Sequence, residues 1–187
     1  KDAVSMLTTL GVINGKEDGS YFDPTGNVTR AEMAKMITVA LHGGEEPVLG
    51  TKTNPSYSDI KGHWAESYIE YCTSVGIISG RGNGKFDPAA TVTVAEAAKM
   101  LLVAVGYDPA IEGFEGADWA INVSVRADEQ GIFEGFTKDL SAPLNRDDAA
   151  LLIYNALDVE MIQSYTTNNY PIVYSDHRTI LSDKYGV

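Results

Sequence analysis

The chain contains an internal repeat, and this feature constrains its fold more than any other. The first two copies share a glycine-bounded pentapeptide, a Phe-Asp-Pro turn and a Thr-x-Ala-Glu motif, at residues 11–15, 22–24 and 29–32 and at residues 76–80, 86–88 and 93–96. A third copy is more divergent, with GIFEG at 131–135 and Asn-Arg-Asp-Asp at 145–148. Each copy must therefore form a similar unit of supersecondary structure.

Each copy is predicted to be a helix, a glycine-rich loop and a second helix. The first helix is clearest in the second copy, where Trp64 to Val75 carries apolar residues at helical spacing. Gly76 follows as a natural helix C-terminus, because glycine adopts positive φ without a steric cost. In the loop that comes next, Pro88 prevents either helix from extending into it.

The second helix of each copy has a predicted start and a repeated apolar stripe. Thr29, Thr93 and Asn145 are typical N-cap residues, and an acid follows three positions later. In the first two copies that acid is Glu, which predicts a capping box. The stripe recurs at the same five positions: Met33, Met36, Ile37, Ala40 and Leu41; Ala97, Met100, Leu101, Ala104 and Val105; Ala149, Leu152, Ile153, Ala156 and Leu157.

Three equivalent helices with equivalent stripes pack most simply on one another about a pseudo-threefold axis. The sequence therefore predicts an all-α fold with a central three-helix bundle. Its repeats are predicted at residues 1–42, 56–106 and 114–158, and the first lacks the opening that Trp64 provides in the second. Residues 159–187 read as a loop, one short extended segment and a frayed end that leads toward a further domain.

Composition excludes several classes of partner. The chain has 14 Lys and Arg residues against 26 Asp and Glu residues, a formal net charge of -12. An acidic surface repels nucleic acid and anionic membranes. No apolar run is long enough to span a bilayer, so membrane insertion is not expected. Cys72 is the single cysteine, so an internal disulfide is impossible. It lies on an apolar helical face and is predicted to be a small core residue.

The combined motifs resemble those of the S-layer homology family. The resemblance rests on DIKGHWA at 59–65, on the segment 76–88, and on VTRAE at 28–32. It covers roughly residues 1–158. It implies three modules in a pseudo-trimeric spindle that hold an exported protein on secondary cell-wall polysaccharide, often pyruvylated, at the bacterial cell surface. The alternative is a scaffold that binds other surface-layer proteins or assembles with itself.

Arg30 is the leading candidate for ligand contact. It follows the N-cap Thr29, where free helix amides favour an anion, and its planar guanidinium suits a carboxylate such as a pyruvyl group. The alternative is that Arg30 pairs with a nearby acid. Val94 replaces the arginine in the second copy, whereas Arg146 keeps it in the third.

Five further residues are candidates for sugar binding. Trp64 and Trp119 open the first helices of the second and third copies and either stack on a sugar ring or pack between repeats. Asp59 and His63 either bond sugar hydroxyls or cap a helix, and Arg81 lies in a glycine loop. We predict one main groove, with Arg30 on one wall and the segment from Asp59 to Trp64 on the other.

Two rival functions find less support in the sequence. An enzyme needs catalytic groups, yet Glu32 and Glu96 are accounted for by capping and the three histidines occupy unrelated contexts. A calcium site is suggested by fragments at 17–20 and 81–84, but neither has the alternating acids of an EF-hand loop. We therefore expect no catalysis, no cofactor and no metal.

Overall fold

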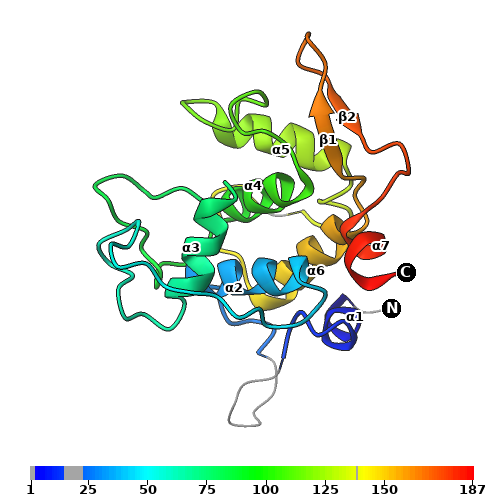
Figure 1. Ribbon diagram of the computed structural model, residues 1–187. Helices are drawn as coiled ribbons and strands as arrows, with labels where there is room; N and C mark the ends of the chain where they lie inside the picture. The colour runs from blue at the N-terminus through cyan, green and yellow to red at the C-terminus, as the bar shows by residue number, and fades with distance from the viewer. Residues whose placement is uncertain (1–2, 15–22, 138) are drawn as a thin grey trace.

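The computed structural model describes residues 3–14, 23–137 and 139–187. Within these ranges the chain forms α1 (Ala3–Thr9), α2 (Arg30–Leu41), α3 (Glu66–Ser74), α4 (Val94–Val105), α5 (Trp119–Glu129), α6 (Arg146–Leu157), β1 (Ile162–Tyr165), β2 (Pro171–Val173) and α7 (Ile180–Tyr185). Helices thus dominate, with one two-stranded hairpin (Figure 1), and the predicted all-α class is confirmed. None of the described helices is both long and apolar enough to cross a lipid bilayer.

The second helices of the repeats begin where their caps predict. Helices α2, α4 and α6 are 12 residues long, with N-caps Thr29, Thr93 and Asn145. Each cap side chain accepts a hydrogen bond from the backbone amide three residues later, at 3.1, 3.2 and 2.8 Å. The caps satisfy only these third amides. The first two amides of each helix donate to backbone carbonyls of another repeat, as Arg30 does to Ala90 at 2.9 Å and Ala31 to Pro88 at 3.1 Å, so they are not free to bind an anion.

A closed ring of backbone hydrogen bonds joins the three repeats just before these helices. The Val28 amide donates to the Leu144 carbonyl, the Leu144 amide to Val92, and the Val92 amide to Val28, at 2.9, 3.0 and 2.9 Å. Three equivalent β-bridges accompany the ring, between Asn27 and Asn145, Thr29 and Thr91, and Thr93 and Pro143. All three ring side chains are fully buried. The N-terminal ends of α2, α4 and α6 therefore have threefold order.

The first helix of each repeat packs on the second helix of another repeat. Helix α3 packs on α2, α5 on α4, and α1 on α6. At the first of these contacts the Cys72 thiol lies 3.3 Å from the Thr38 hydroxyl. Cys72 is fully buried, which confirms its predicted place in the core, and burial raises the pKa of its thiol to about 11.

This packing buries a second face on each central helix. Ala34 and Thr38 of α2 and Ala98 and Leu102 of α4 are fully buried, although they lie outside the predicted stripe. Conversely, the stripe residues Met36, Leu41 and Ala104 are only partly buried. The central helices are therefore covered on two faces rather than one.

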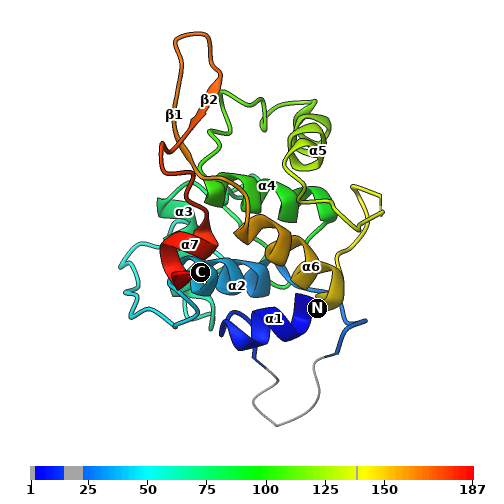
Figure 2. The same ribbon diagram turned by 90° about the vertical axis from the view of Figure 1, so that its right-hand side faces the viewer.

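After residue 158, the predicted loop and short extended segment correspond to the hairpin turn and β2, whereas the prediction of a frayed end is wrong. Strands β1 and β2 form an antiparallel hairpin in which Ile162 pairs with Val173. Helix α7 follows and lies against α2 and α6 (Figure 2). Its first residue, Ile180, is only 4% exposed. The C-terminal segment is thus packed onto the repeats.

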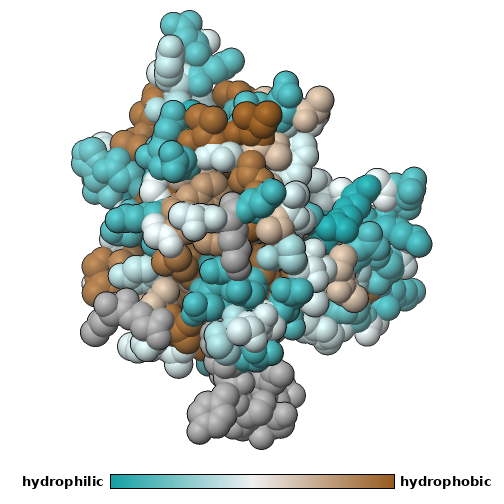
Figure 3. All heavy atoms as spheres, turned by 180° about the vertical axis from the view of Figure 1, so that it is seen from behind, coloured by the Kyte–Doolittle hydropathy of each residue, from teal (hydrophilic) through white to brown (hydrophobic). Residues whose placement is uncertain are grey.

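The outer surface mixes polar and apolar groups. Seen from behind, apolar residues reach the surface in patches that hydrophilic residues interrupt (Figure 3). Helix α5 buries Val123 and Ala127 but exposes Ile121 and Val125. Only a narrow face of α5 therefore packs on α4.

Candidate functional site

A cleft of about 460 Å³ lies where the loop of the second repeat meets the starts of α2, α4 and α5. It is lined by Arg30, Ile77, Ile78, Ser79, Gly80, Arg81, Glu96, Lys99, Met100, Phe114, Glu115, Gly116 and Trp119. The lining thus draws on all three repeats. It brings together three of the predicted site residues, Arg30, Arg81 and Trp119.

Arg30 is held inside the wall of this cleft. Its Nε donates to the Phe86 carbonyl at 2.9 Å, its Nη2 to the Ser79 carbonyl at 3.4 Å, and its Nη1 forms an ion pair with Glu96. The guanidinium carbon also lies 4.5 Å from the centre of the Phe86 ring. Because only 7% of its side chain is exposed, burial lowers the pKa of Arg30, against the opposing charge of Glu96. Of the two interpretations of Arg30, pairing with a nearby acid is the one that this geometry matches.

Glu96 joins Arg30 to a second arginine. Its carboxylate also accepts a hydrogen bond from Arg81 Nη2 at 2.8 Å. Since the carboxylate faces these two cations, it does not accept the Thr93 amide, and the predicted capping box at Thr93 is wrong. The box at Thr29 is confirmed, because Glu32 there accepts the Thr29 amide at 3.0 Å.

The cleft also presents an exposed cation, Arg81, and a half-buried one, Lys99, near an aromatic ring. Arg81 keeps 37% of its side chain exposed. The Lys99 ammonium lies 5.8 Å from the centre of the Trp119 ring, a cation-π distance. Burial lowers the pKa of Lys99, and the charge of Glu115 opposes that shift. With Arg30, three cations face two carboxylates, so the cleft is locally positive in a chain with a formal net charge of -12.

Asp59 supports this cleft from outside it. Its carboxylate accepts the backbone amides of Phe86 and Asp87 at 2.9 and 2.8 Å. Burial alone would raise the pKa of Asp59, but these hydrogen bonds outweigh it, and its pKa lies below the ordinary value. Asp59 thereby fixes the turn that offers the Phe86 carbonyl to Arg30. Its side chain acts within the fold and does not line the cleft.

His63 and Trp64 also lie outside the cleft lining. The Nδ1 atom of His63 accepts the Ala65 amide at 3.1 Å, as a local cap of the segment that leads into α3. Trp64 is 57% exposed, so it is not core, and its ring centre lies 5.5 Å from that of His63. The cleft that contains Arg30 therefore does not include the segment from Asp59 to Trp64. Trp119 is the tryptophan that shares the cleft with Arg30.

Arg146 occupies in the third repeat the position that Arg30 occupies in the first, but its ion pair is longer. Its Nη1 lies 3.4 Å from the Glu32 carboxylate, as Arg30 pairs with Glu96. In the sequence repeat, Trp64 corresponds to Trp119. Residues 15–22, which the sequence aligns with the second-repeat loop, lie outside the described residues, as does the first calcium-like fragment. Within the described ranges, no three His, Cys, Asp or Glu side chains come together as a metal site.

Comparison with protein families identifies two of the three repeats. The family described as the S-layer homology domain matches residues 1–34 and 56–98. These segments contain the Thr-Arg-Ala-Glu motif and the glycine loop that carries Arg81.

Curated relatives align with most of the chain. It is 29% identical over 162 residues to a "Cell surface protein" of Thermoanaerobacter kivui and 30% identical over 162 residues to a "Middle cell wall protein" of Brevibacillus brevis. It is also 30% identical over 172 residues to "Exoglucanase XynX" of Acetivibrio thermocellus. These alignments cover 86%, 86% and 84% of this chain but only 20%, 15% and 15% of the relatives. The chain therefore spans a fifth or less of each relative's length.

Proposed function

We propose that this chain, which belongs to the S-layer homology family through residues 1–34 and 56–98, anchors an exported protein at the bacterial cell surface. The names of its relatives, a cell surface protein and a cell wall protein among them, support this location. The anchor is non-covalent, and its partner is secondary cell-wall polysaccharide.

The module is proposed to bind and not to catalyse. An aligned segment of similar length occurs in a cell wall protein and in an exoglucanase, so the feature common to both is not one enzymatic activity. The motif carboxylates are also engaged within the fold: Glu32 binds the Thr29 amide, and Glu96 binds Arg30 and Arg81. Neither acid is placed as a free general acid or base.

The observation that carries the proposal is the meeting of Arg81, Lys99 and Trp119 in one positive cleft. The Trp119 ring offers a flat apolar face on which a sugar can stack. Arg81 and Lys99 extend their charges beside it and can bind a carboxylate, as on a pyruvylated sugar. Arg30 has its donors engaged within the wall, so its role is to hold Glu96, and through it Arg81, in place.

The remaining predicted residues take supporting or secondary roles. Asp59 and His63 shape the loop and the helix start, respectively. We assign Arg146 and Trp64, the repeat counterparts of Arg30 and Trp119, to a second, weaker binding surface, because the ion pair from Arg146 to Glu32 is longer than that from Arg30 to Glu96.

Calorimetry with a purified pyruvylated wall fragment tests this binding mode. Arg81→Gln is expected to weaken binding about 10-fold or more, because a charge-assisted hydrogen bond contributes about 1.5–3 kcal/mol. Trp119→Ala is expected to weaken it to a similar extent, because it removes the ring face on which the sugar stacks. Arg178→Gln is the matched control, since Arg178 is an exposed, acid-paired arginine outside the cleft. Equal affinity for the fragment after removal of pyruvate, or full affinity of both cleft variants, would rule out the proposed mode.

Sedimentation with cell-wall sacculi separates the anchor from a surface-layer scaffold. Relatives named as surface layer and S-layer proteins make self-assembly the alternative. An anchor sediments with intact sacculi and stays in solution once the secondary polysaccharide has been stripped. Equal sedimentation with stripped sacculi, or concentration-dependent assembly without them, would favour the scaffold.

A further inference from the structure

The central bundle is incomplete on one side. Helix α4 packs against both α2 and α6, whereas α2 and α6 make little direct contact with each other. The hydrogen-bond ring holds their N-terminal ends together, but their C-terminal ends lack an equivalent connection. Because α2 and α6 are connected at their N-terminal ends alone, apolar surface is left between their C-terminal ends.

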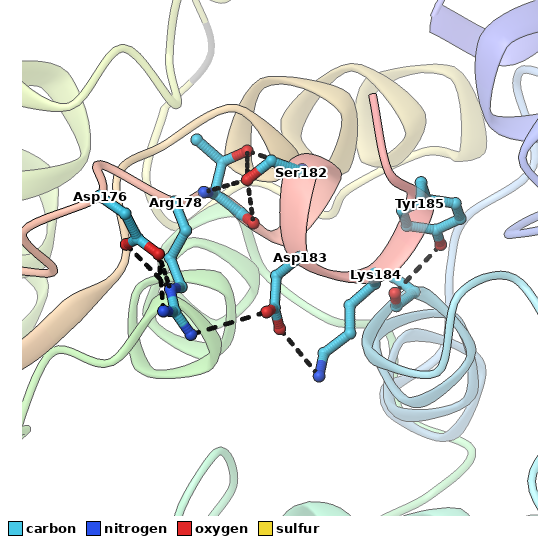
Figure 4. Close-up of polar contacts among 8 residues, drawn as sticks. Asp176, Arg178, Ser182, Asp183, Lys184 and Tyr185 are labelled. Atoms are coloured by element: carbon cyan, nitrogen blue, oxygen red, sulfur yellow. Dashed lines mark hydrogen bonds and ion pairs between the residues drawn. The ribbon is translucent and has the colours of Figure 1, made fainter.

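Helix α7 fills this space. It contacts both α2 and α6, and its Ile180 is 4% exposed. The Tyr185 hydroxyl donates to the Ala40 carbonyl at 3.0 Å, in the last turn of α2, where helix carbonyls lack partners of their own (Figure 4). Burial raises the pKa of Tyr185 to about 12, as expected for a phenol held against the core.

The outer face of α7 is polar. Asp183 lies between Arg178 and Lys184, at 3.8 and 2.9 Å, and Arg178 also pairs with Asp176 (Figure 4). At its start, Thr179 and Ser182 form a capping box. Since this six-residue helix is too short to be stable alone, its order comes from these local bonds and from packing on α2 and α6.

The hairpin of β1 and β2 attaches the first part of the C-terminal segment to the end of α4. A side chain at Gly106, just after α4, would lie 2.7 Å from the Ile162 carbonyl oxygen, so the two backbones are in close contact. The Tyr165 hydroxyl donates to Glu112 at 3.0 Å and accepts the Asp108 amide at 2.9 Å. At the base of the hairpin, the Met161 amide donates to the Arg178 carbonyl at 2.9 Å.

We propose that residues 159–187 form a C-terminal clasp that ties the ends of α2, α4 and α6 together. The clasp is then the counterpart of the hydrogen-bond ring at the opposite end of the bundle. The working module extends to α7, and a boundary at residue 158 would remove the part that joins the C-terminal end of α2 to that of α6. The clasp lies about 15 Å along α2 from Arg30 and acts independently of what the cleft binds.

Hydrogen exchange on the full chain tests the clasp locally. Tyr185→Phe removes one hydrogen bond and little volume, so protection of the amides at 40–44 is expected to fall about 3- to 10-fold. The amides at the end of α4 should keep their protection, because the hairpin holds them. Tyr170→Phe is the matched control, since Tyr170 is 70% exposed and lies in the hairpin turn away from α2.

A second variant loosens α7 itself. Ile180→Ala removes buried methyl groups, and we expect a fall in Tm of roughly 5–15 °C together with a larger loss of protection at 40–44. A loss concentrated at the ends of α2 and α6 supports the clasp. Unchanged exchange at 40–44 in both variants, or an increase spread evenly over all helices, would overturn it.

Discussion

At the scale of single residues, similar side chains have different roles because their burial differs. Arg30 and Arg81 both bind Glu96, yet 7% of one side chain is exposed and 37% of the other. Arg30 also donates to two carbonyls of the second repeat. It therefore joins the first repeat to the second, whereas Arg81 remains accessible from the cleft.

This difference in burial predicts different losses of stability when each arginine is replaced. Arg30→Ala should lower the free energy of unfolding by about 2–4 kcal/mol, because it leaves Glu96 without its buried partner. Arg81→Ala should cost less than about 1 kcal/mol, as is usual for an exposed pair. Urea denaturation followed by circular dichroism measures both. Equal losses in the two variants would contradict the structural role of Arg30.

Glu70 predicts how stability depends on pH. Its carboxylate is 4% exposed and accepts the Ser56 amide and hydroxyl at 2.6 and 2.7 Å, with Lys52 at 2.8 Å. Burial alone would raise the pKa of Glu70, but these partners outweigh it and lower the pKa. The folded-state pKa is thus below the unfolded value of about 4.3. The stabilisation is present above that value and is lost as pH falls through the folded-state pKa.

The test compares stability curves between about pH 3 and pH 5. In Glu70→Gln, the free energy of unfolding should decline less steeply as pH falls over this range, since the variant has no carboxyl to protonate at this position. Glu45→Gln, at an exposed position, is the control and should keep the wild-type slope. A slope that stays unchanged in Glu70→Gln would show that other carboxylates govern the acid transition.

At the scale of helices, each central helix buries more than its predicted stripe. The stripe faces the other central helices, and the second buried face receives the first helix of another repeat. Leu102 lies on this second face of α4 and is fully buried, whereas the stripe residue Met36 of α2 is only partly buried. Helix packing, and not the stripe alone, therefore decides which truncation costs most.

Two core truncations compare these faces. Leu102→Ala should lower the free energy of unfolding by about 2–5 kcal/mol, because it leaves a cavity between α4 and its neighbours. Met36→Ala should cost about 1 kcal/mol, since part of that side chain already contacts water. Chemical denaturation of both variants gives the order, and a greater loss in Met36→Ala would show that the stripe dominates.

At the scale of the whole molecule, the repeats form a closed structure and not an open stack. In an open array each repeat contacts only its neighbours and can unfold from an end. Here the ring of Val28, Val92 and Leu144 returns to its start, and α1 of the first repeat packs on α6 of the third. No repeat is terminal, so the structure should unfold as one unit.

Fluorescence from each of the two tryptophans tests whether the repeats unfold together. Trp64→Phe leaves fluorescence from the third repeat, and Trp119→Phe leaves it from the second. The two melting curves should coincide in shape with the transition followed by circular dichroism. Adding Leu144→Ala should lower the Tm of every curve together by roughly 5–15 °C, because Leu144 is fully buried and belongs to the hydrogen-bond ring. A second-repeat signal that stays at its original Tm would contradict closure.

Local chemistry along the chain was sufficient to predict the repeats, the helix starts and the candidate residues. Thr29, Thr93 and Asn145 cap their helices through bonds to amides three residues away, and such contacts depend on sequence alone. Apolar periodicity likewise predicts a helix and its stripe without reference to the rest of the molecule. Arg30, Arg81 and Trp119 were identifiable because the motif and the loop single them out.

Only the tertiary structure decided which residues meet. Arg30 shares its cleft with Trp119 and not with Trp64, because the order in which the repeats pack places α5 beside the second-repeat loop. Glu96 could have completed a capping box, but two arginines from distant segments compete for its carboxylate. No sequence motif singles out Lys99, and only the packing of α5 on α4 brings Trp119 near its ammonium. Helix α7 is ordered by a space between α2 and α6 that no local pattern describes, since contacts distant in sequence create it.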